Sequence, residues 1–163
     1  MNLNVRQVEQ FVVDELRKQI QLDFNQLKMV READLECCVY YHLRKVFRKD
    51  RSWKVLARKH SIHTGHYVDL LIFRGTTPQF AIELKWNAAS MSLKDRRSLR
   101  RCVIKLGVHK AYFITTHYSK RSFEEIIKID ACEKHHIFEL VISLPYIGDQ
   151  RLIQAKHSSS AKR

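Results

Sequence analysis

The sequence predicts a single α/β domain in which a central mixed β-sheet is flanked by helices. Two segments with helical spacing of apolar residues open the chain, three strand-like runs follow, and helices then alternate with strands. No repeat or linker divides the 163 residues, and 45% of them are hydrophobic, enough for one substantial core. We expect the domain to span residues 1–153, with 1–28 as an N-terminal helical extension and 29–153 as the core.

Two amphipathic helices are predicted first. Residues 5–22 repeat apolar side chains every three or four positions, and the Asp and Asn among residues 23–27 predict a break. A second helix is predicted over residues 29–48. Its apolar stripe consists of Leu35, Val39, Leu43 and Val46.

Three strands are predicted next, over residues 53–58, 67–73 and 80–86. Each is rich in β-branched, aromatic or other large apolar residues. Gly65 marks the first turn, and the Gly and Pro of the sequence RGTTPQ mark the second. Short connections of this kind predict an antiparallel meander.

A basic helix is predicted over residues 92–106. Ser92 is the expected N-cap, Asp95 follows three residues later as in a capping box, and Gly107 stands where the helix should end.

The remainder of the chain is predicted to continue the alternation. A strand over 111–117, a helix over 122–135 and a last strand over 137–145 follow in order. Helical crossovers would add these strands to the meander and make the sheet mixed. Residues 154–163 are polar and basic, and they predict a disordered tail.

The charge balance indicates a polyanionic partner. Lys and Arg number 30 against 17 Asp and Glu, a formal net charge of +13, which exceeds the roughly 2–8 that solubility alone suggests. No apolar run approaches the roughly 20 residues of a membrane helix, and the N-terminus has charges within its apolar pattern, unlike a signal peptide. We expect a cytoplasmic protein that binds nucleic acid rather than membrane.

The cysteines and histidines show no zinc-binding spacing. Cysteines at 37, 38, 102 and 132 include no Cys-x-x-Cys pair, so we expect free buried thiols in a reducing compartment. The groups His60/His63/His66 and His135/His136 are alternative metal clusters, and surface histidines are the simpler interpretation.

Charged residues interrupt the predicted hairpin of residues 67–86. Alternate side chains of a strand share a face, so Glu83 and Lys85 lie together with Ala81. The opposite face carries Phe80, Ile82, Leu84 and Trp86. Asp69 lies in the preceding apolar strand, and the hairpin can bring it near Glu83 or Lys85. Burying two carboxylates costs several kcal/mol each unless a cation compensates, which predicts Mg²⁺ or Mn²⁺ between them. The alternative is a half-exposed sheet with these charges in solvent.

Asp69 followed by Glu83-Leu84-Lys85 resembles the active-site signature of the PD-(D/E)XK nuclease superfamily. The resemblance covers about residues 29–117 and implies the restriction-endonuclease-like fold. One departure is Val68, where the signature has proline, a residue without a chemical role.

The resemblance also implies roles for these residues. Asp69 and Glu83 would bind catalytic Mg²⁺, for which Mn²⁺ may substitute, with the Leu84 carbonyl as a further ligand. Lys85 would orient or deprotonate the attacking water.

The family's helical glutamate has two candidates here. At about 100° per residue, Glu32 lies about 20° from Val39 in the middle of the apolar stripe, and Glu36 lies about 60° off it. We expect Glu32 to join the metal site. The alternative for Glu32 is a first-turn position favoured by the helix dipole.

The basic helix is the predicted nucleic-acid contact. Its candidate phosphate-binding residues are Lys94, Arg97, Arg100, Arg101 and Lys105. A solvated basic face is the alternative. The second helix adds Arg44, Lys45, Arg48, Lys49 and Arg51.

These features predict a metal-dependent endonuclease that hydrolyses phosphodiester bonds in DNA, in repair, recombination, restriction, or the processing of phage or transposon DNA. A non-catalytic nucleic-acid-binding or assembly protein on the same fold and an RNA-processing nuclease remain alternatives. Cutting both strands would require a homodimer or a partner recombination or recognition protein.

Overall fold

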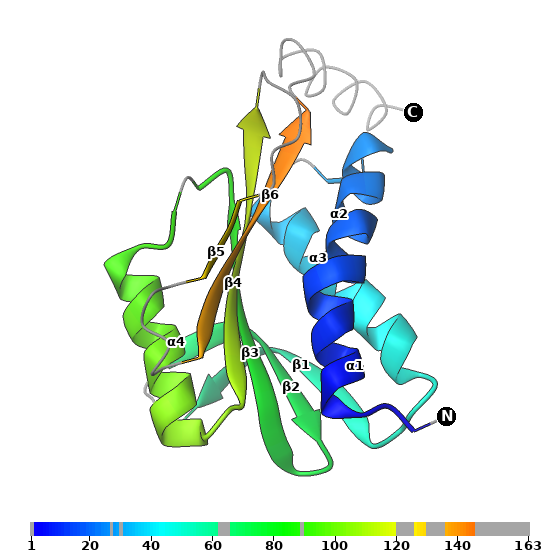
Figure 1. Cartoon of the computed structure of the whole chain (residues 1–163), viewed down its shortest axis with the longest axis vertical. Helices are drawn as coiled ribbons and strands as arrows, with labels where there is room; N and C mark the ends of the chain where they lie inside the picture. The colour runs from blue at the N-terminus through cyan, green and yellow to red at the C-terminus, as the bar shows by residue number, and fades with distance from the viewer. Residues whose placement is uncertain are drawn as a thin grey trace, which may run out of the picture.

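A six-stranded sheet lies between two helical layers in the computed structural model, which describes residues 2–26, 28–29, 31–61, 66–88, 90–119, 126–129 and 136–145. The helical elements are α1 (Val5–Gln10), the π-helical turn η1 (Phe11–Glu15), α2 (Leu16–Asn25), α3 (Glu32–Phe47) and α4 (Leu93–Leu106). The strands are β1 (Trp53–Ser61), β2 (His66–Arg74), β3 (Thr77–Trp86), β4 (Lys110–Ser119), β5 (Ile126–Ile129) and β6 (Ile137–Pro145). The N-terminal helices cover one face of the sheet and α4 covers the other (Figure 1).

The sheet is mixed, as predicted, with strand order β1-β2-β3-β4-β6-β5. The first three strands form an antiparallel meander. The crossover through α4 makes β4 parallel to β3, and β6 is parallel to β4. Because β3, β4 and β6 run parallel, their C-terminal ends lie at the same end of the sheet.

The two faces of β3 pack into separate cores. Phe80, Ile82 and Leu84 are fully buried in the core beneath the N-terminal helices. Ala81 packs into the smaller core beneath α4. The predicted division of the strand is therefore confirmed, and it places Glu83 and Lys85 on the α4 side.

The N-terminal helices differ from the prediction at their ends. Helical structure continues through Asn25, into the predicted break at 23–27, and Phe24 in this last turn is buried in the core. The next helix begins at Glu32 rather than at residue 29, because Arg31 takes an extended N-cap conformation. Packing of Phe24 thus outweighs the local preference of Asp and Asn for a break.

The predicted helix over 122–135 is wrong where the structure describes it. Ile126–Ile129 form β5, which pairs antiparallel with β6. Three of its four residues are isoleucines, which favour strands, and β6 supplies the backbone partners that a local pattern does not reveal. Residues 122–125 and 130–135, the turn at Gly65 and the predicted tail over 154–163 lie outside the described residues.

The prediction for α4 is confirmed at both ends. The Ser92 hydroxyl accepts the Asp95 N–H, and Gly107 ends the helix at φ 64°. Glycine adopts this left-handed conformation without the steric cost of a Cβ.

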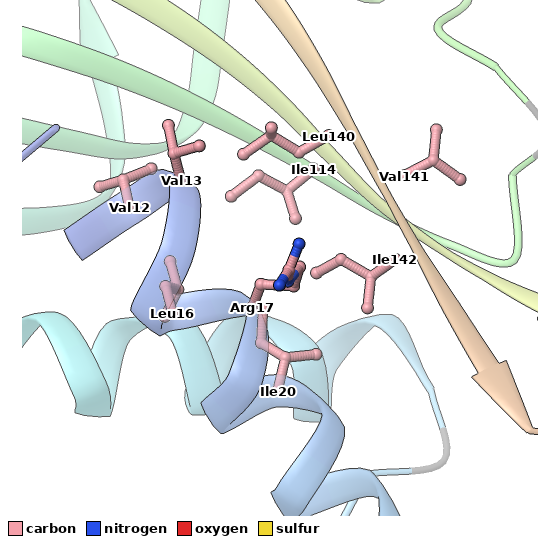
Figure 2. Close-up of a pocket in the computed structure, with 9 residues that line it drawn as sticks. All are labelled: Val12, Val13, Leu16, Arg17, Ile20, Ile114, Leu140, Val141 and Ile142. Atoms are coloured by element: carbon pink, nitrogen blue, oxygen red, sulfur yellow. The ribbon is translucent and has the colours of Figure 1, made fainter. Parts of the chain in front are cut away.

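A small apolar pocket lies between the N-terminal helices and the strands β4 and β6 (Figure 2). Its lining is Val12, Val13, Leu16, Arg17, Ile20, Ile114, Leu140, Val141 and Ile142. Its volume of about 10 Å³ suffices for about one water molecule, so it is a packing gap rather than a ligand site. Among the described residues, no helix has the length and apolar character to cross a membrane.

Candidate active site

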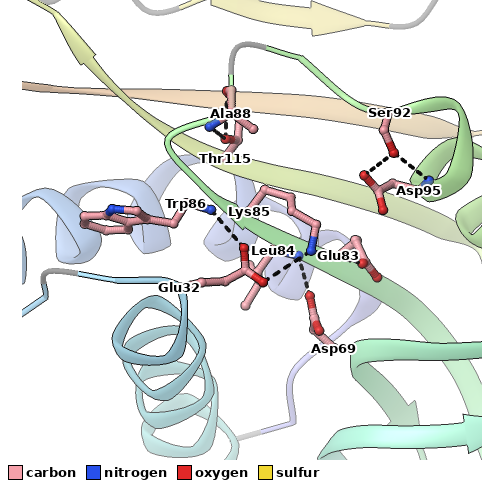
Figure 3. Close-up of polar contacts among 10 residues, drawn as sticks. All are labelled: Glu32, Asp69, Glu83, Leu84, Lys85, Trp86, Ala88, Ser92, Asp95 and Thr115. Atoms are coloured by element: carbon pink, nitrogen blue, oxygen red, sulfur yellow. Dashed lines mark hydrogen bonds and ion pairs between the residues drawn. The ribbon is translucent and has the colours of Figure 1, made fainter.

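The strands β2 and β3 separate where the charged residues lie. Their described pairing runs from Arg74–Thr77 to Leu70–Ile82, and Asp69 and Glu83 come next. Asp69 bridges the opening, because its Oδ2 accepts the Leu84 N–H at 2.7 Å. Asp69, Glu83 and Lys85 therefore gather at this fork instead of lying on opposite sides of the sheet (Figure 3).

Glu83 is the acid of this cluster whose ionised form is disfavoured most. The residue is 9% exposed, and its Oε2 atom has no hydrogen-bond partner among the described residues. Burial raises the pKa of Glu83 to about 7, and the negative charge of Asp69 adds to the effect. Burial also raises the pKa of Asp69, against the opposing influence of the Leu84 N–H and Lys85. The positive charge close to Asp69 and Glu83 is therefore not enough to offset both carboxylates.

Among the described residues, Lys85 supplies the ammonium group of this cluster. Its Nζ lies 3.3 Å from Glu32 Oε1 and 3.7 Å from Glu83 Oε1. Burial acts to lower the pKa of Lys85, but the charges of Glu32, Glu83 and Asp69 together raise it. Lys85 is therefore protonated at neutral pH, which suits it to orient and stabilise anions rather than to remove a proton.

The helical acids occupy positions that the helical periodicity did not predict. Glu32 is the first residue of α3 and its side chain is 50% exposed, so it does not lie in a core-facing stripe. It reaches the sheet instead, where Oε2 accepts the Trp86 N–H at 3.3 Å. Glu36 lies one turn further along, and its negative charge raises the pKa of Asp69 more strongly than that of Glu32 does. Glu32 thus positions Lys85, and Glu36 acts on Asp69.

The start of α4 adds a residue to the site that sequence reasoning assigned only to capping. Asp95 is buried, and its Oδ2 accepts the Ser92 hydroxyl at 2.6 Å. Its charge also contributes to the raised pKa of Glu83. No sequence signal relates Asp95 to Glu83, because the proximity arises only when α4 packs on the sheet.

The predicted phosphate-binding residues lie on the exposed side of α4. All five are exposed: Lys94, Arg97, Arg100, Arg101 and Lys105. The helix begins next to the acidic cluster, since Asp95 acts on Glu83.

A second basic region lies at the opposite end of α3. Arg44, Arg48, Arg51 and Lys54 line a hollow of about 290 Å³, and none of them forms an ion pair within the described part of the chain. The hollow is roughly 20 Å from Glu32, measured along the helix.

A further group of metal-ligating side chains joins α2 to α3. The ligand atoms of Asp23, Cys38 and His42 all lie within 4.8 Å of one another. Burial raises the pKa of the Cys38 thiol, which lies 3.2 Å from Asp23 Oδ2, and His42 Nε2 lies 2.8 Å from the same oxygen. Burial acts to raise the pKa of Asp23, but these contacts lower it.

This group was not expected from the sequence. Cys38 and His42 have i, i+4 spacing on a helix, which was the available signal, but Asp23 comes from another helix. The thiols of Cys37, Cys38 and Cys102 are free, and Cys37 is exposed rather than buried. Cys132 and the side chains of His60, His63, His66 and His135 lie outside the described part of the chain.

Comparisons with known proteins leave the family open. No protein-family model matches the sequence, and no curated protein matches it. A solved chain from the refined half-complex of the tetradecameric assembly of Thermococcus gammatolerans McrB AAA+ hexamers with bound McrC is similar, with a TM-score of 0.45 and 12% identity. The similarity covers 98% of this chain and 43% of that chain, so this chain spans less than half of its length. At this TM-score the similarity establishes neither fold nor function.

Proposed function

We propose that this protein has a restriction-endonuclease-like fold and is a metal-dependent nuclease of the PD-(D/E)XK type that hydrolyses phosphodiester bonds in DNA. The observation that carries the proposal is the Oε2 atom of Glu83, buried without a hydrogen-bond partner among the described residues and close to a second acid. An unpaired buried polar group costs about 1–3 kcal/mol, and more when it is charged. A dication between Asp69 and Glu83 would remove that cost.

The donor set fits a hard cation. Asp69 and Glu83 supply carboxylate oxygens, which suit Mg²⁺ or Mn²⁺. The Leu84 N–H points toward Asp69, and in an extended strand the carbonyl of the same residue points to the same side. The Leu84 carbonyl is therefore the expected third ligand from the chain. When bound, Mg²⁺ would polarise a scissile phosphate and lower the pKa of a water molecule.

The remaining residues of the site act on the phosphate. Lys85 presents a fixed ammonium that would stabilise negative charge developing on the phosphoryl oxygens. Glu32 holds that ammonium in place and so acts as a positioning residue. Glu36 increases the negative potential at Asp69, which favours cation binding. The site therefore divides into an ion-binding part and a phosphate-binding part.

A nucleic acid is the substrate class that the charge distribution favours. The exposed basic residues of α4 begin beside the acidic cluster, and phosphate contacts of this kind position a duplex without reading its sequence. The hollow lined by Arg44, Arg48, Arg51 and Lys54 would hold phosphates further along the backbone.

The test compares cleavage by wild type, Asp69→Asn and Lys85→Ala. Plasmid, linear and branched DNA, with matched RNA, are incubated with Mg²⁺. Both variants should lose cleavage by at least about 100-fold, since each removes a group that acts on the transition state. Lys18→Ala is the matched control, because Lys18 is an exposed lysine paired with Glu15 on α2. It should cut as wild type does.

Three outcomes would overturn the proposal in different ways. Equal cleavage by wild type and both site variants would show that catalysis occurs elsewhere. Wild type that binds DNA and is stabilised by Mn²⁺ through Asp69, yet cuts neither nucleic acid, would favour the non-catalytic alternative. Faster cleavage of RNA than of DNA would assign the protein to RNA processing.

A further inference from the structure

Outside the proposed active site, one group of described side chains brings together the three donor types that transition metals use. Asp23 on α2 supplies a carboxylate oxygen, and Cys38 and His42 on α3 supply a sulfur and a ring nitrogen. Cys38 is 8% exposed and His42 is 7% exposed, so their side chains have little freedom to move apart. The group therefore persists as a unit in the folded protein.

The distances in the group are close to those of a tetrahedral site. An ion about 2.0–2.3 Å from each ligand atom holds those atoms about 3.3–3.8 Å apart. Asp23 Oδ2 lies 3.2 Å from Cys38 Sγ and 2.8 Å from His42 Nε2, and all three atoms lie within 4.8 Å of one another. Widening the Oδ2–Nε2 separation by about half an ångström would bring this pair to the spacing of two ligands on one ion.

We propose that Asp23, Cys38 and His42 form a second metal site that binds a zinc-class dication and joins α2 to α3. Mixed sulfur, nitrogen and oxygen donors select such borderline ions, whereas the all-oxygen set of Asp69 and Glu83 selects Mg²⁺. The two sites would therefore hold different metals.

The surroundings supply the remaining requirements of a metal site. Asp23 binds through Oδ2, because its Oδ1 lies 3.4 Å from Lys28 Nζ. A hollow of about 190 Å³ has His42 in its wall. A water molecule would complete the four ligands of a tetrahedral ion. Binding replaces the thiol proton of Cys38 by the ion and releases that proton to solvent. The Nε2 proton of His42, which donates to Asp23 Oδ2 in the metal-free state, must also leave Nε2, and the metal-bound neutral ring carries its single proton on Nδ1.

Without a metal, the same residues form a hydrogen-bond network. The Cys38 thiol donates a hydrogen bond to Asp23 Oδ2, and His42 Nε2 forms a second hydrogen bond with the same oxygen. A network of this kind would also tie α2 to α3, so loss of stability in a variant does not separate the two roles. The decisive measurement is direct binding of a metal through sulfur.

The experiment titrates the metal-free chain of 163 residues with Co²⁺, a spectroscopic substitute for zinc. Wild type should bind one equivalent with a thiolate-to-cobalt charge-transfer band, and Zn²⁺ should displace it. Cys38→Ser should abolish the band and raise the Kd more than about 100-fold. His42→Gln should raise the Kd similarly. Circular dichroism establishes that both variants are folded.

Three variants serve as matched controls. Cys37→Ser changes the neighbouring exposed thiol, and Cys102→Ser changes a buried thiol on α4. Asp69→Asn removes the proposed magnesium ligand, so a band that persists in this variant comes from the second site alone. Absence of a thiolate band in wild type would overturn the proposal, as would a band that survives in Cys38→Ser. Neither result would affect the proposed nuclease site.

Discussion

Replacing Glu83 by Gln tests whether ionisation of Glu83, at the point where β2 and β3 separate, destabilises the folded protein. Burial, with the charge of Asp69 second, raises the pKa of Glu83 from 4.5 to about 7. The folded state therefore binds this proton more tightly than the unfolded chain does. The free energy of unfolding then falls as pH rises from about 4.5 to about 7, and the loss is complete above that range. At about 1.4 kcal/mol per pH unit, the loss is about 3 kcal/mol.

Glutamine at position 83 cannot ionise, so this loss should be absent from Glu83→Gln. The free energies of unfolding of the variant and of wild type are compared in metal-free buffer. Relative to wild type, the variant should be more stable at about pH 8 than at about pH 5, by about 3 kcal/mol. Urea denaturation followed by circular dichroism measures both values. Added Mg²⁺ or Mn²⁺ should stabilise wild type at the higher pH and leave the variant nearly unchanged.

Glu139→Gln is the matched control for this experiment. Glu139 is a buried glutamate on β6 whose carboxylate accepts the Met91 N–H at 2.9 Å. This variant should keep the metal response of wild type. If the difference in free energy of unfolding between Glu83→Gln and wild type is the same at both pH values, ionisation of Glu83 does not destabilise the folded protein. Equal stabilisation of both by Mg²⁺ would remove Glu83 from the ion site.

Three other predictions concern separate parts of the molecule. Lys85→Ala should lose cleavage yet keep the thermal stabilisation by Mn²⁺, because Lys85 contacts carboxylate oxygens and is no ligand. Combining Lys94→Ala with Arg97→Ala should reduce the slope of log affinity for DNA against log salt by up to about 2, since each lost phosphate contact removes about 0.9. Gly107→Ala should lower the free energy of unfolding by about 1–2 kcal/mol, measured in urea, because φ at this position is 64°.

Each of these predictions has a contradicting result. Loss of Mn²⁺ stabilisation in Lys85→Ala would mean that the lysine supports the ion site itself. An unchanged salt slope would place the DNA away from α4. Full stability of Gly107→Ala, compared with Gly75→Ala at a φ of 60° in the β2–β3 turn, would show that the helix end relaxes without cost.

The sequence by itself determined the features that depend on neighbouring residues. The alternation of Phe80, Ile82 and Leu84 with Ala81 and Glu83 specified which side of β3 faces each core, because a strand projects successive side chains to opposite faces. Ser92 and Gly107 specified the ends of α4, because capping satisfies local backbone groups. The mixed sheet followed from the order of these elements.

Only the tertiary structure decided the features that join distant segments. Pairing with β6 made Ile126–Ile129 a strand, although the local pattern suggested a helix. The late start of α3 turned Glu32 from an expected core position into a partner of Lys85, 53 positions away. The approach of α2 to α3 brought Asp23 to Cys38 and His42. Burial and the charges of other elements set the pKa of Glu83, and these arise from packing that no run of neighbouring residues contains.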